Sequence, residues 1–137
     1  MDEERRRVVR QAWILWAALL MGPLMFFVIV LFLQEGGRFE APVAEPPGLY
    51  LQLGWAVTVL CVVTSIAMRI LRFRPRLRGE ATPPQSWLAG NLVGWALCEG
   101  AALLAVTLVL LTGELTPYVY PGAIAFAVQV LQFPRGG

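Results

Sequence analysis

The sequence contains no histidine and no lysine, and it contains only two cysteines, Cys61 and Cys98. Without histidine or a Cys-x-x-Cys pair, the usual signatures of zinc, haem and thiol-redox sites are missing. The usual acid–base groups of enzymes are missing too, because there is no histidine and no pair of acids within the apolar part of the chain. We therefore predict no metal, no cofactor and no catalytic residue, and we expect that the protein is not an enzyme.

Long polar stretches are also scarce. Of the 137 residues, 58% are hydrophobic, against about 45–50% in typical soluble domains. The apolar residues form four blocks, each close to the ~20 residues that a helix needs to cross the ~30 Å hydrocarbon core of a bilayer. These predicted spans are 11–33, 50–71, 87–112 and 117–133.

The blocks are predicted to be helices, because a chain inside lipid must satisfy its backbone hydrogen bonds within the segment. A transmembrane barrel requires strands of about ten residues with alternating polarity, and no such pattern occurs. The predicted fold is an all-α integral membrane four-helix bundle that forms a single transmembrane domain over residues 1–137. Gly22-Pro23 interrupts the first block, and we expect a packing kink there.

The arginines predict how the bundle is oriented. They gather before the first block and after the second, whereas the 34–48 loop holds only Arg38 and the 113–117 turn holds none. The positive-inside rule then places both termini in the cytoplasm of a multi-pass protein of the inner (plasma) membrane. The arginines expected at cytoplasmic lipid headgroups are Arg5, Arg6, Arg7, Arg10, Arg72, Arg74, Arg76 and Arg78. Since topology explains them, we expect no nucleic-acid partner.

Glu99 is the exception in the third block, because it lies near the middle of that span. An acid at this depth costs about 2.5–3.5 kcal/mol on insertion scales and is rare without a role. Every arginine is near a membrane face, so we expect Glu99 to be neutral most of the time. Two interpretations stay open. Glu99 either forms a structural hydrogen bond, for example to Thr58, Thr64 or Ser65, or binds a proton or cation.

Small residues recur every four positions beside Glu99, which favours close packing of the third block against another helix. The short 113–117 turn predicts that the third and fourth blocks are antiparallel neighbours. The fourth block carries a matching pair of alanines. The residues predicted to make this contact are Gly90, Gly94, Cys98, Ala102, Ala123 and Ala127.

The segment 95–103, Trp-Ala-Leu-Cys-Glu-Gly-Ala-Ala-Leu, resembles the carboxylate-bearing helix of rotary ATPase proteolipids, the c-ring subunits. The resemblance covers about twenty residues and implies that Glu99 is a carboxylate that binds the transported proton or sodium ion. The glycine-rich partner helix of that family is absent from the first two blocks. The C-terminal half, which closes with Phe133-Pro134-Arg135, also resembles uncharacterised small four-helix bacterial membrane proteins.

Two functions therefore stay open. The first is a proton- or cation-responsive subunit of an oligomeric membrane complex that uses Glu99. The alternative is a structural or assembly protein that docks onto a larger complex, with Glu99 as a hydrogen-bonding residue. In both cases the expected partners are the lipid bilayer and either further copies of the chain or other subunits.

Overall fold

The computed structural model describes residues 3–36, 40–42, 47–79 and 83–135, with the side chains of residues 72–77 left out. Within these ranges the chain contains four helices and no strand, so the all-α prediction is confirmed. The helices are α1 (Glu3–Glu35), α2 (Gly48–Leu77), α3 (Pro84–Thr112) and α4 (Val119–Leu131).

Three of the helices are long and apolar enough to cross a membrane, with mean hydropathies of 2.6 for α1, 1.9 for α2 and 2.0 for α3 in their most apolar windows. The helix α4 has 13 residues and is therefore about 20 Å long, which is less than the ~30 Å of a bilayer core. The predicted span 117–133 is shorter because Pro134 disfavours helical backbone at Phe133 and Pro117 precedes the helix.

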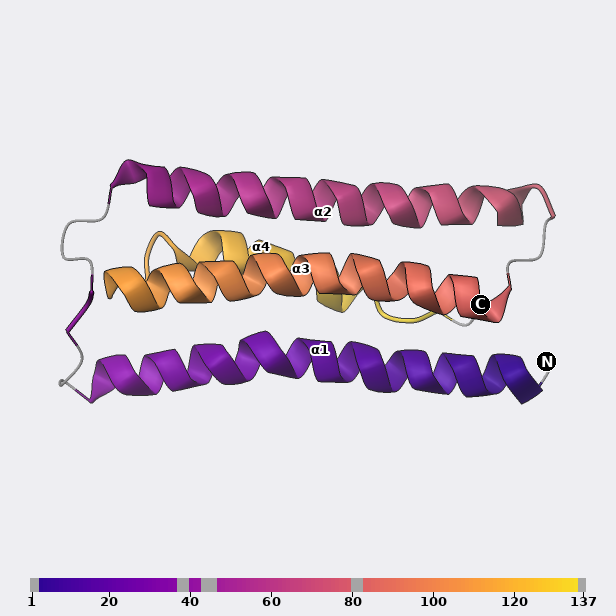
Figure 1. Ribbon diagram of the computed structural model, residues 1–137, viewed down its shortest axis with the longest axis horizontal. Helices are drawn as coiled ribbons and strands as arrows, with labels where there is room; N and C mark the ends of the chain where they lie inside the picture. Colours follow the sequence, from indigo (N-terminus) through magenta and orange to yellow (C-terminus); the bar gives the residue numbers. More distant parts are fainter. Residues whose placement is uncertain (1–2, 37–39, 43–46, 80–82, 136–137) are drawn as a thin grey trace.

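The helix α3 is the centre of the fold. Figure 1 shows α3 between α1 and α2, with α4 against one face of this layer. Among the described residues, α1 and α2 make no contact with each other, and both contact α3. The helices α1 and α3 run in the same direction, and the N- and C-termini lie at the same end of the bundle.

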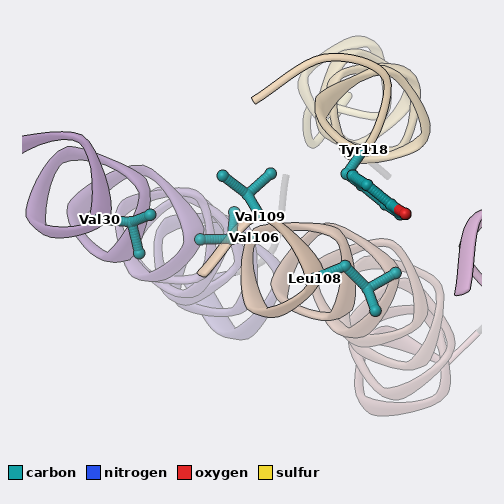
Figure 2. Close-up of a cluster of buried hydrophobic side chains, with 5 residues drawn as sticks. All are labelled: Val30, Val106, Leu108, Val109 and Tyr118. Atoms are coloured by element: carbon teal, nitrogen blue, oxygen red, sulfur yellow. The ribbon is translucent and has the colours of Figure 1, made fainter. Parts of the chain in front are cut away.

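The core follows α3 because this helix is covered from three sides. Half of its most apolar window is buried, compared with 11% for α1. Near the ends of α1 and α3, Val30 packs with Val106 and Val109, and Tyr118 closes the cluster from the start of α4 (Figure 2). The apolar side chains on the outward faces of α1 and α2 remain exposed, as is expected of helices that would face lipid.

A glycine allows α4 to approach α3 closely. A β-carbon on Gly122 would lie only 2.6 Å from the β-carbon of Ala105. Ala125 follows one turn later and packs with Ala101 and Ala102. The α3–α4 contact thus depends on small residues on both helices, which is the packing that favours association in lipid.

Candidate functional site

Glu99 projects from α3 toward α1, where it meets a glycine. Its Oε1 lies 2.8 Å from the position that a β-carbon on Gly22 would occupy, and the side chain is half-buried. Since any other residue at position 22 would carry that β-carbon, Gly22 provides the space for the carboxyl group. Glu99 therefore lies at the α1–α3 contact.

The carboxyl group of Glu99 forms no hydrogen bond and no ion pair with the described residues. Arg10 on α1 is twelve residues before Gly22, which corresponds to about 18 Å along the helix. No group of three or more Cys, Asp or Glu side chains gathers as a metal site in the described ranges. Within the described part of the chain, the carboxyl is thus a single acid whose polar atoms have no partner.

The turn of α1 beside Glu99 has a backbone carbonyl without its helical donor. Pro23 lies inside α1, and proline has no N–H to donate to the carbonyl of Leu19. A protonated carboxyl has one O–H to donate, whereas an ionised carboxylate only accepts hydrogen bonds. Leu19 is three residues before Gly22, so this carbonyl lies within one turn of the α1 residue that Glu99 meets.

The hydroxyl groups expected near Glu99 lie elsewhere. Ser65 Oγ donates to Oε1 of Gln132 at 2.8 Å and is 3.3 Å from the carbonyl oxygen of Gly94. Thr58 is buried, and its Oγ1 has no hydrogen-bond partner among the described residues. Both side chains belong to α2, which contacts α3 and α4 but not α1. The structure thus brings neither to Glu99.

A buried polar cluster connects α4 to the other helices, and sequence reasoning missed its glutamines. The backbone carbonyl of Gln132 accepts a hydrogen bond from Trp95 Nε1 at 2.9 Å, and that of Gln129 accepts one from Trp16 Nε1 at 2.9 Å. Gln129 is 0% exposed, and neither polar atom of its side chain has a partner within the described part of the chain. The available signal was the four-residue and three-residue spacing of Ala125, Gln129 and Gln132, which places them on one face of a helix.

The structure buries much of the expected small-residue strip on α3. Gly94, Cys98 and Ala102 are buried, and Gly90 is half-buried. On α4 the contact face differs from the expected one. The alanines expected there, Ala123 and Ala127, are both exposed, and Gly122 and Ala125 take their place at α3.

The segments that carry the expected headgroup arginines, the start of α1 and the end of α2, lie at the end of the bundle that holds both termini (Figure 1). Arg6, Arg7, Arg10 and Arg78 are exposed, and Arg5 is half-exposed. The side chains of Arg72, Arg74 and Arg76 lie outside the described part of the chain. At the opposite end, Glu35, Glu40 and Glu114 are exposed. Glu3 and Glu4, in the first turn of α1, are exposed at the arginine-rich end, so the described arginines gather at one end while the described acids occur at both.

A cavity of about 220 Å³ lies between α1, α3 and α4. Its lining is entirely apolar and includes Pro23, Phe27, Val106 and Phe126. Neither Glu99 nor Gly22 belongs to the lining, so the cavity lacks a polar group that would orient a ligand.

No protein family, curated protein or solved structure matches this chain. The function is therefore argued from the residues and their geometry.

Proposed function

We propose that the protein is a small membrane subunit in which Glu99 binds and releases a proton or a cation. The observation that best supports this is the position of the Glu99 carboxyl against Gly22, in a helix long enough to span a bilayer, without a hydrogen-bond or ion-pair partner among the described residues. Acids at such positions mark ion and proton paths in membrane proteins. The resemblance of the α3 segment to c-ring carboxylate helices supports the same function.

The proposed placement is the inner (plasma) membrane, with both termini in the cytoplasm. Three helices of spanning length support insertion. The gathering of the described arginines at one end supports the orientation, because cytoplasmic ends carry the excess of arginine. The position of both termini at the arginine-rich end agrees with this orientation.

The geometry suggests how the two states of Glu99 differ. In the neutral state Glu99 has an O–H to donate, and the turn of α1 before Gly22 contains the Leu19 carbonyl, which Pro23 leaves without a helical donor. In the charged state the carboxylate only accepts hydrogen bonds, so a cation or water must stabilise it. Loss of the proton therefore changes what Glu99 can bind at the α1–α3 contact.

A hydrophobic carbodiimide tests the proposal, because it reacts with protonated carboxyl groups in apolar surroundings. We expect Glu99 to be labelled in membranes, with labelling suppressed by sodium ions or by alkaline pH. Glu114 is exposed outside the helices and serves as the internal control, since a water-facing acid is labelled poorly by this reagent. Glu99 that stays unlabelled at every pH would contradict the proposal.

One observation favours the alternative, an assembly protein in which Glu99 is structural. Because α1 and α2 do not touch, the face of α3 opposite α4 is uncovered. On this face Val93 is 47% exposed, and a β-carbon on Gly100 would meet no atom within 4 Å. A further copy of the chain or a subunit of a larger complex would cover it. Gly100→Leu should then abolish co-purification of that partner while leaving carbodiimide labelling of Glu99 intact.

A further inference from the structure

Two arginines meet at the last described residues of the chain, at the end of the bundle that holds both termini. Arg69 of α2 donates through Nη2 to the carbonyl oxygen of Phe133 at 3.5 Å. The guanidinium carbon of Arg135 lies 5.0 Å from the centre of the Phe133 ring. Phe133 thus contacts both guanidinium groups, that of Arg69 through its backbone carbonyl and that of Arg135 through its ring.

The arrangement leaves two positive charges uncompensated. Arg135 is close enough to Arg69 for their charges to repel each other. Among the described residues, neither guanidinium has a carboxylate within ion-pair distance. Arg69 is also half-buried, so water screens its charge less than it screens a surface arginine. An anion between the two guanidinium groups would offset their mutual repulsion and accept hydrogen bonds from the N–H groups of both.

The surroundings of the two arginines favour an anionic group that belongs to an otherwise apolar molecule. The ring of Trp13 on α1 lies beside the Phe133 ring, with 6.1 Å between the ring centres, and Trp13 is 43% exposed. Beside it, Ile14 is 62% exposed on the outward face of α1. Tryptophan with one side in apolar surroundings and one side near water is typical of the headgroup level of a bilayer. The arginine pair is therefore at the depth of lipid phosphates and next to a face suited to acyl chains.

We propose that Arg69 and Arg135 form a binding site for the phosphate of an anionic phospholipid, with Trp13 and Phe133 packing against its glycerol and upper acyl region. The proposal is independent of Glu99. The site differs from the general attraction of the N-terminal arginines to anionic lipid, because here two guanidinium groups share one phosphate.

The test uses the purified full-length protein in a neutral detergent, with phosphatidylglycerol, phosphatidylcholine or inorganic phosphate added. Phosphatidylglycerol should raise the thermal unfolding temperature, and the two other additions should not. R135Q should keep the wild-type unfolding temperature without lipid, because Arg135 is exposed. It should weaken phosphatidylglycerol binding by about tenfold, the effect of losing one charged hydrogen-bonding group.

A double-mutant cycle separates a shared phosphate from independent charges. R69Q and R135Q together should weaken phosphatidylglycerol binding little more than either change alone. The matched pair R78Q and R135Q should be additive, because Arg78 is exposed at the same end but lies nine residues after Arg69, about 14 Å along a helix. Additive losses for R69Q and R135Q would overturn the shared site. An equal rise with inorganic phosphate would overturn the lipid as its source.

Discussion

Oε1 of Glu99 lies 2.8 Å from the position that a β-carbon on Gly22 would occupy, so the carboxyl group of α3 rests against the backbone of α1. Gly22→Ala should therefore displace the carboxyl. The cost in stability should be less than about 1 kcal/mol, since the displaced atom ends a flexible side chain and alanine favours helix. The measurable effect is a changed rate of carbodiimide labelling at Glu99.

Gly100→Ala is the matched control for this prediction. It makes the same change beside Glu99, but the new β-carbon meets no atom within 4 Å. Labelling of this variant should equal that of the wild type. Equal labelling of Gly22→Ala as well would show that the carboxyl does not contact α1.

Glu99→Gln should fold as the wild type does and lose its biological activity if the group must titrate. The amide keeps the size of the side chain and a hydrogen-bond donor, but it cannot release a proton. Glu99→Leu removes the donor too, so a lower unfolding temperature for Leu than for Gln would show that the donor is used. A Gln variant that is active as well as stable would leave only the structural interpretation.

Gly122→Ala should lower the free energy of unfolding by about 1–3 kcal/mol, the usual cost of overpacking. Its β-carbon would lie 2.6 Å from that of Ala105, where neither helix has a flexible side chain that can give way. Gly100→Ala should be neutral or stabilising, because its environment is open and alanine favours helix. Thermal unfolding in detergent measures both, and a neutral Gly122→Ala would contradict the α3–α4 packing.

Gln129→Leu and Gln132→Leu should change stability in opposite directions. Gln129 is buried, and both polar atoms of its side chain lack a hydrogen-bond partner among the described residues, so an apolar side chain of similar volume should add about 1 kcal/mol or more to the free energy of unfolding. Gln132 accepts the hydrogen bond of Ser65 at 2.8 Å, and its loss should cost a comparable amount. A Gln129→Leu variant less stable than the wild type would mean that the amide is satisfied in the membrane.

Reporter fusions test the orientation. Fusions after Glu114 should report a location outside the cytoplasm, and fusions after Arg78 should report a cytoplasmic one. The reason is the gathering of the arginines at the end that includes Arg78. An external signal after Arg78 would invert the proposed topology.

Much of the fold follows from the sequence because apolar length and helical backbone are linked in lipid. The spans 11–33, 50–71 and 87–112 lie within α1, α2 and α3, each of which extends beyond its span at one or both ends into polar residues. The spans were read from hydropathy, whereas helical hydrogen bonds continue until a turn or proline intervenes. In the fourth span the helix is instead shorter than the apolar run, because Pro134 disfavours helical backbone before the run ends.

Which helices are neighbours, and how each helix is rotated about its own axis, are harder to predict from the sequence than the spans are. Gly22 was interpreted as part of a proline kink, although it lies opposite Glu99. The parallel directions of α1 and α3 bring their midpoints to one depth, but hydropathy does not say which helices touch. On α4, Ala123 and Ala127 are four residues apart and Gly122 and Ala125 are three apart, and both spacings place two small residues on one helix face. In the structure Tyr118 and Pro121 are buried, and Tyr118 packs with Val109 of α3, so the face of α4 that they share is turned inward.

Among the described residues, α1 and α2 do not contact each other, and in the proposed membrane placement this has a consequence for biogenesis. The ribosome would deliver these two helices first, and each would insert as an apolar segment without a surface on the other to bind. Assembly of the bundle would therefore wait for the synthesis of α3, which contacts both. A chain truncated after α2 should leave two inserted helices that diffuse separately in the bilayer.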